Sequence, residues 1–229
     1  MLREIRIPTI LAALAAGPAA AGSFEGGTVA FAMFNANGGE YSVNELSGSA
    51  VFRLNDRLLV QGDLSHIGEF DEDNYGVHLI YSASADVALG VFYNRDQLSA
   101  YGFDQIGAEV KTALDYEGRP LTLSGFLSTE NDDGPFGLTY NYVGVRLAAP
   151  IAQDLTLTGT VASVWESADV DVATGALRYD AGKGIYAELS YTTTSGDFDK
   201  NSLGFEVGYD FGSGPIFADR TWASLFHGL

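Results

Sequence analysis

Large apolar residues recur at every second position along most of this chain, and this period of two constrains its fold more than any other feature. Successive side chains of a β-strand point to opposite faces of its sheet, so the pattern predicts strands with one apolar and one polar face. We therefore expect an all-β chain with no helix of consequence between residues 22 and 211. The clearest example is Leu203, Phe205, Val207, Tyr209 and Phe211, which alternate with glycine or acidic residues.

Twelve segments share this alternation, and most are about as long as the 9 to 11 residues that a tilted strand needs to cross a membrane. An even number of strands brings both ends of a closed barrel to the same side. The expected strands span residues 27–35, 41–54, 58–68, 75–83, 87–95, 104–115, 121–129, 138–148, 155–165, 171–180, 185–194 and 202–211.

The connections between these segments alternate in kind along the chain. One set consists of tight turns, such as residues 55–57 and 84–86, whereas the other consists of acidic and mostly longer loops, such as residues 69–74 and 130–137. Tight turns on one side and longer polar loops on the other are typical of transmembrane β-barrels, whose turns are periplasmic and whose loops are outside.

The first 21 residues have the features of a secretory signal peptide. Arg3 and Arg6 form a short positive head, an apolar run follows over residues 7–16, and Ala19 and Ala21 fit a small-residue cleavage site. We therefore expect export and cleavage near Ala21. This divides the chain into a signal peptide (residues 1–21), a barrel (22–211) and a C-terminal extension (212–229).

The chain is strongly acidic, with a formal net charge of −18, and it contains no cysteine. The charge argues against a nucleic-acid partner, because phosphates require a basic surface. The missing cysteines fit an exported protein that uses no disulfide bonds, but neither property determines the fold.

Alternation alone does not separate a soluble β-sandwich from a membrane barrel, and a sandwich remains an alternative. The placement of the aromatic residues favours the barrel, because rings gather at both ends of the apolar strand faces, where they would form two interfacial girdles. The ordinary strand preference of aromatic residues is the competing explanation. The loop-side rings are Tyr75, Tyr93, Trp165 and Tyr191, and the turn-side rings are Tyr81, Tyr179, Tyr209 and Phe211.

The last predicted strand resembles the insertion signal that ends many outer-membrane proteins, with its alternating apolar residues and its closing aromatic, Phe211. Together with the signal peptide, it makes the sequence similar to the porin-like outer-membrane β-barrels of Gram-negative bacteria. The resemblance implies a closed antiparallel up-and-down barrel of about twelve strands in the outer membrane. It also implies contact with outer-membrane lipid and lipopolysaccharide, and insertion by the barrel-assembly machinery.

The resemblance further implies a channel for passive diffusion of small hydrophilic solutes or ions. Two alternatives remain open: a structural or adhesive barrel with a filled lumen, and an outer-membrane lipid hydrolase. The extension at residues 212–229 departs from the family, which usually ends at the terminal aromatic. With Trp222, Leu225 and Phe226, it could cap the periplasmic mouth, plug the lumen or lie disordered, and we favour the cap.

Charged residues on the polar faces are the candidate lumen residues. Both signs in one lumen can orient dipolar solutes, or the charges can pair and simply fill a narrow barrel. Arg178 and Glu188 are expected to be diagonal neighbours across the turn at residues 180–183. The candidates are Arg53, Lys111, Arg146, Arg178, Glu109, Asp115, Glu188, Glu206 and Asp210. The acidic residues expected at the outer rim are Asp71, Glu72, Asp73, Asp132 and Asp133.

Histidine offers little support for catalysis. A serine hydrolase needs a base within hydrogen-bond reach of its nucleophile. His78 and Ser82 share a face but lie four residues apart along a strand, about 13 Å, whereas His66 and His227 have no matching motif. The acidic segment 71–74 lacks the spacing of an EF-hand loop. We expect no catalytic residue, no metal site and no cofactor.

Overall fold

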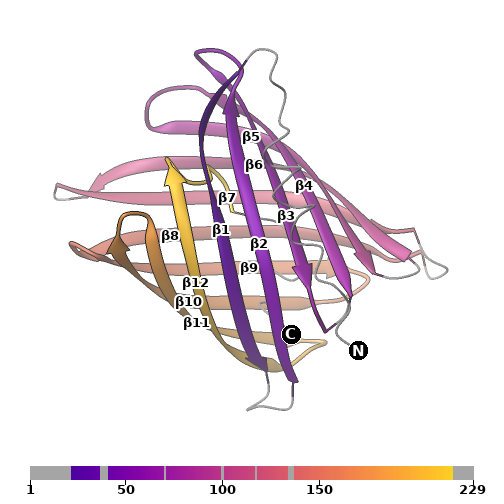
Figure 1. Cartoon of the computed structure of the whole chain (residues 1–229). Helices are drawn as coiled ribbons and strands as arrows, with labels where there is room; N and C mark the ends of the chain where they lie inside the picture. Colours follow the sequence, from indigo (N-terminus) through magenta and orange to yellow (C-terminus); the bar gives the residue numbers. More distant parts are fainter. Residues whose placement is uncertain are drawn as a thin grey trace, which may run out of the picture.

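The computed structural model describes residues 22–36, 41–69, 71–98, 101–116, 118–133 and 137–218, and these residues form a closed antiparallel β-barrel (Figure 1). All twelve expected strands are present. They are β1 (Ser23–Ala36), β2 (Tyr41–Arg53), β3 (Leu58–Ile67), β4 (Glu72–Ser82), β5 (Val87–Leu98), β6 (Tyr101–Tyr116), β7 (Arg119–Asp132), β8 (Thr139–Ala152), β9 (Leu155–Glu166), β10 (Val170–Gly182), β11 (Ile185–Gly196) and β12 (Lys200–Gly212). No helix in the described ranges is long and apolar enough to cross a membrane.

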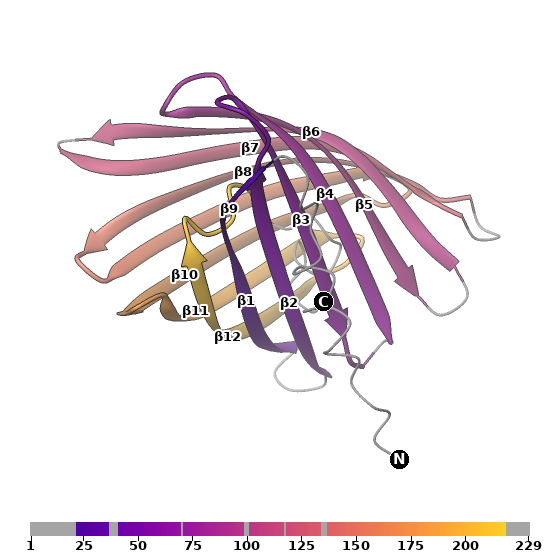
Figure 2. The same ribbon diagram turned by 45° about the horizontal axis from the view of Figure 1, so that its top comes forward.

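The barrel closes where its first and last strands meet. β1 pairs with β12 from Gly26 opposite Gly212 to Ala36 opposite Ser202, and every other strand pairs with its neighbours in sequence. Figure 2 shows β1 lying between β2 and β12. Closure leaves no sheet edge, so the backbone donors and acceptors of the edge strands are paired as they must be in lipid.

Several strands are longer than the alternation predicts. β4 begins at Glu72 instead of residue 75, and β7 runs on to Asp132 instead of residue 129. The added residues are polar and lie on the loop side. Apolar alternation marks only the part of a strand that faces apolar surroundings. The backbone hydrogen bonds between strands continue beyond that part. The predicted twelve-strand barrel is confirmed. The ends of its strands differ from the predicted ends for this reason.

The exposure of the two faces separates the barrel from the soluble sandwich. On β4, Tyr75, Val77 and Leu79 are 46–49% exposed, whereas Asn74 and His78 are at most 1% exposed. A soluble domain would bury the apolar face and leave the polar one wet, because that arrangement removes apolar surface from water. The opposite distribution is that of a barrel whose outer face meets lipid.

The C-terminal strand presents the expected insertion-signal residues on its outer face. Leu203, Phe205, Val207 and Tyr209 are 44–53% exposed, and Phe211 stacks near Phe24 with ring centroids 5.7 Å apart. The expected signal peptide, residues 1–21, lies outside the described residues.

The extension is described only in part, so the cap across the periplasmic mouth that the sequence favours stays a prediction. Its described part, residues 213–218, turns back along the inner face, and Phe217 is only 2% exposed. Phe217 packs with Val51, Leu59 and Ile80 on the inner wall. This position is favourable because burying the Phe217 ring removes its apolar surface from water. Trp222, Leu225 and Phe226 lie outside the described residues.

A charge on the outer face should destabilise the barrel according to its depth in the membrane. Leu189 and Ile185 share the outer face of β11, but Ile185 is the first residue of the strand. We expect Leu189→Arg to lower the free energy of unfolding in lipid vesicles by about 2–4 kcal/mol and Ile185→Arg by about 0–1 kcal/mol. Denaturant titration followed by tryptophan fluorescence measures both. Equal losses would contradict a lipid-facing β11.

Candidate functional site in the barrel lumen

The inner face of the barrel gathers polar side chains from nearly every strand, because every second residue of each strand points inward. Two regions differ in chemistry. The half next to the tight turns holds both basic and acidic groups, whereas the half next to the long loops holds buried carboxylates, amides and hydroxyls.

Arg53 lies at the turn-side mouth and pairs with a carboxylate that the sequence pattern did not single out. Its Nε donates to Glu25 Oε1 over 2.8 Å and its Nη2 donates to Oε2 over 3.3 Å. Both side chains are about one-third exposed. A two-pronged pair of this kind holds the guanidinium against the wall with its charge largely neutralised.

Arg178 joins three strands, β10, β11 and β12, in the same half. Its Nη2 donates to Asp180 over 2.9 Å and to Asp210 over 2.5 Å, and its guanidinium lies 3.7 Å from the ring centroid of Tyr186. Tyr186 in turn donates to Glu206 over 2.6 Å. The contacts therefore link two of the predicted lumen residues, Arg178 and Asp210, directly and a third, Glu206, through a tyrosine.

The prediction that Arg178 and Glu188 are diagonal neighbours is wrong. The two residues are directly opposite each other in the β10–β11 register, yet the guanidinium binds Asp180 and Asp210. The turn at residues 180–185 contains a register shift between Asp180 and Gly182. A residue count from the turn does not predict such a shift. Asp210 comes from β12, the second strand after β10, so its approach depends on the register of both intervening pairings.

The remaining predicted lumen residues differ in their surroundings. Glu109 is buried and bonds to His78, and Lys111 donates to the carbonyl of Ile216 over 2.7 Å. Asp115 is exposed and accepts from the backbone of Gly118 in its own turn. Arg146 and Glu188 are half-buried on β8 and β11.

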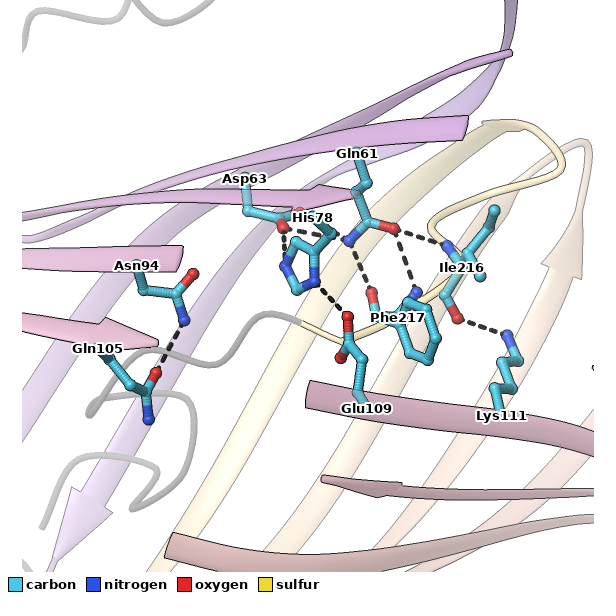
Figure 3. A network of polar contacts seen from close by, with 9 residues as sticks. All are labelled: Gln61, Asp63, His78, Asn94, Gln105, Glu109, Lys111, Ile216 and Phe217. Atoms are coloured by element: carbon cyan, nitrogen blue, oxygen red, sulfur yellow. Dashed lines mark hydrogen bonds and ion pairs between the residues drawn. The ribbon is translucent and has the colours of Figure 1, made fainter. Parts of the chain in front are cut away.

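His78 is a completely buried polar group of the lumen and lies between two carboxylates (Figure 3). Its Nδ1 lies 2.5 Å from Glu109 Oε1, and its Nε2 lies 2.8 Å from Asp63 Oδ2. A carboxylate at each nitrogen suits an imidazolium, which can donate from both positions. The three groups come from β3, β4 and β6, and His78 is completely buried, so an imidazolium at this position offsets part of the charge of the two carboxylates beside it.

Gln61 extends this network toward the chain end. Its Nε2 lies 3.0 and 3.1 Å from the two oxygens of Asp63. Neither Gln61 nor Asp63 is among the lumen residues expected from the sequence. The signal was available, because both alternate with the apolar residues Leu58, Val60 and Leu64 on β3.

A second group of inward residues, which we call the loop-side polar cluster, fills the other half of the lumen. With its amide nitrogen toward the carboxylates, Asn74 donates to Asp96 over 2.9 Å and to Glu72 over 3.0 Å, and it accepts from Ser65. Asn94 donates to Gln105, and Gln105 donates to Ser128. The cluster consists of Ser65, Glu72, Asn74, Asn94, Asp96, Gln105, Ser128, Glu130 and Tyr142, all at most 5% exposed.

The acidic residues expected at the outer rim do not act as one group. Glu72 is buried in the lumen, whereas its neighbour Asp73 faces outward and lies 2.9 Å from the ring of His66. Strand β4 already begins at Glu72, so adjacent carboxylates point to opposite faces. This alternation also prevents the segment 71–74 from converging on one metal ion.

Asp133 connects the loop that follows β7 with the region around the β5–β6 loop. It accepts from the backbone of Gly102 and from Arg95, each over 2.6 Å, and Arg95 also binds Asp104. The Gly102 N–H first, and then the Arg95 guanidinium, hold the pKa of Asp133 below its ordinary value. Asp71, which has a left-handed backbone (φ 50°), and Asp132 are the other two predicted rim residues.

The described histidines are paired with carboxylates. His66 contacts Asp73, and His78 contacts Asp63 and Glu109. A serine hydrolase would require a hydroxyl at one ring nitrogen. His227 lies outside the described residues. In the described part of the chain, no group of three or more acidic, histidine or cysteine residues has the geometry of a metal site.

Comparison with known proteins places the fold in one class. No protein-family model matches the sequence. No curated protein matches it either. Among solved structures, the NanC porin superposes with a TM-score of 0.61 at 9% identity, covering 79% of this chain and 98% of that one.

Two further structures are similar. The KdgM porin in complex with disordered oligogalacturonate has a TM-score of 0.59 at 9% identity, covering 80% of this chain and 99% of that one. Outer membrane protein Omp33 of Acinetobacter baumannii has a TM-score of 0.54 at 12% identity, covering 82% and 99%. The fold is therefore that of the porin-like outer-membrane channels, and it supports an outer-membrane location.

The buried histidine should matter far more to stability than the exposed one. His78→Leu leaves Asp63 and Glu109 buried without a cation, and we expect it to lower the free energy of unfolding by about 3–5 kcal/mol. His66→Leu is the matched control. It breaks a half-exposed pair with Asp73, for which we expect a loss of at most about 1 kcal/mol. Denaturant titration in vesicles measures both, and a loss for His78→Leu no larger than for His66→Leu would contradict the ion pairing of His78 with Asp63 and Glu109.

Proposed function

We propose that this protein is an outer-membrane channel of the porin type, which lets small hydrophilic solutes or ions diffuse through its lumen. The observation that carries the proposal is the reversed arrangement of the barrel, with apolar side chains exposed outside and charged side chains buried inside. The similar solved structures are porins and channels, and this similarity supports the same function. Export with cleavage near Ala21 is part of this proposal.

The charges of the lumen favour cations at its loop-side half. Glu45, Glu72, Asp96 and Glu130 are buried there on the inner face. The basic residues Arg53, Lys111 and Arg178 lie in the turn-side half, where nearby carboxylates bind both arginines. Carboxylates that line a pore raise the local concentration of cations.

A structural or adhesive barrel is the second candidate, and one observation favours it. On β5–β8, large rings lie on the inner side: Phe92 lies across Gly107, and Phe126 lies across Gly144, where an added Cβ would come within 2.3–2.5 Å of the ring. These rings pack with Tyr142 and other buried residues. A lumen filled over its whole section would hold the barrel rigid without conducting.

Conductance separates the two candidates. The mature chain, refolded in detergent and checked by a heat-dependent shift on a gel, is added to a planar lipid bilayer. Stepwise current increases support a channel. A folded, heat-shifted barrel that inserts without conducting would instead support the structural candidate.

Removing the two paired arginines should change the selectivity of the channel. The double variant Arg53→Ala/Arg178→Ala leaves Glu25, Asp180 and Asp210 without their cations. In a potassium chloride gradient, we expect the reversal potential to shift toward that of potassium. Arg57→Ala is the control, because Arg57 lies in the turn and donates outward to Tyr81. An unchanged reversal potential in the double variant would show that these residues do not face the ion path.

A further inference from the structure

The chain does not end at the barrel wall but turns back inside it. Gly212 and Gly214 have left-handed backbones, with φ of 66° and 69°, and the N–H of Ser213 donates to the carbonyl of Glu25 over 3.0 Å. At Gly212, a Cβ would lie 2.2 Å from the carbonyl oxygen of Glu25. These glycines allow the chain to reverse at the turn-side mouth and to follow the inner face.

Two wall side chains bind the backbone of the returning segment (Figure 3). The Gln61 oxygen accepts from the N–H groups of Ile216 and Phe217 over 2.9 and 3.1 Å, and its nitrogen donates to the carbonyl of Phe217 over 2.8 Å. Lys111 donates to the carbonyl of Ile216 over 2.7 Å. All four backbone polar groups of these two residues therefore have a partner on the wall.

The side chain of Phe217 occupies a niche built for a ring. It packs against Val51, Leu59 and Ile80, which are at most 2% exposed. Its ring also stacks on His78, with centroids 6.2 Å apart and planes 10° apart. At Gly90, a Cβ would lie 3.0 Å from this ring and 2.8 Å from Glu109, so glycine leaves the room that both side chains need.

The segment is attached differently from the strands around it. Each strand is joined to its neighbours by a ladder of about ten or more residue pairs, such as Gly26–Ala36 along β12. Beyond Ser213, the segment is held by side-chain hydrogen bonds and one buried ring. Structural units with few contacts open at lower free energy than the fold as a whole. The segment can therefore leave its niche while the barrel stays closed.

We propose that residues 213–218 are a tethered ligand of the lumen, and that Gln61, Lys111 and the Phe217 niche form the latch that holds them. With the latch closed, the segment narrows the turn-side half of the lumen, and its release widens the passage. The latch is defined by the contacts alone, whereas its effect on passage rests on the channel function proposed above.

A single thiol tests the latch directly, because the chain contains no cysteine. Ile216→Cys places the thiol on the segment and keeps the backbone groups that Gln61 and Lys111 bind. We expect the added substitution Gln61→Ala to raise the rate of labelling by a bulky maleimide at least about tenfold. Tenfold corresponds to about 1.4 kcal/mol, within reach of three lost hydrogen bonds.

Gln105→Ala is the matched control, because Gln105 is an equally buried lumen glutamine that binds Asn94 and Ser128 instead of the segment. It should leave the labelling rate unchanged. A heat-dependent gel shift shows that each variant is folded, and Phe217→Ala serves as a second way to open the latch. If the Ile216→Cys protein is labelled at the same rate with and without Gln61→Ala, the proposed latch is wrong.

Conductance of the same proteins tests the effect on passage. Gln61→Ala and Phe217→Ala should raise the mean conductance above that of the wild type. If labelling accelerates and the wild type conducts, but its conductance equals that of the variants, the segment binds without restricting the lumen and its regulatory role is overturned. If no folded variant conducts, the channel function itself fails, and the labelling rates still decide the latch.

Discussion

Backbone hydrogen bonding in lipid is the constraint on which the rest of this structure depends. An unpaired backbone group in the hydrocarbon region costs several kcal/mol, so a membrane-spanning sheet must close on itself. The pairing of β1 with β12 accomplishes this closure. Once the sheet is closed, each strand has one face toward lipid and one toward the lumen, and the period-two alternation assigns every side chain to one of them.

Closure also explains why the lumen is so extensively paired. Polar groups brought inside a narrow barrel lose much of their hydration, and they remain stable only where they find partners. His78 between Asp63 and Glu109, and Arg178 between Asp180 and Asp210, are the two clearest cases. The same groups that stabilise the barrel from within also set the charge that a passing solute would meet.

The C-terminal segment belongs to this same network. Gln61 binds Asp63 on one side and the backbone of Phe217 on the other. The same side-chain amide therefore contacts a carboxylate partner of His78 and the returning segment.

The sequence by itself determined the strands, their number and their outward faces, because alternation is a local property and the apolar residues repeat it along every strand. Of the six carboxylates that are buried on the inner face, Glu45, Asp63, Glu72, Asp96, Glu109 and Glu130, it named only Glu109 as a lumen residue. It could not determine which of them meet, since parity assigns a face and not a neighbour. Asp63, His78 and Glu109 come together from three strands, and Glu72 is drawn inside because β4 begins earlier than its apolar pattern.

Only the tertiary structure decided the position of the segment that follows β12. Residues 213–218 have no periodic pattern, and their place depends on a niche whose parts come from β2, β3, β4 and β6. Such a niche exists only after the strands have closed around it. Local sequence patterns report the hydrogen-bonding and hydrophobic preferences of a segment, whereas contacts between distant segments depend on register and closure, which no single segment encodes.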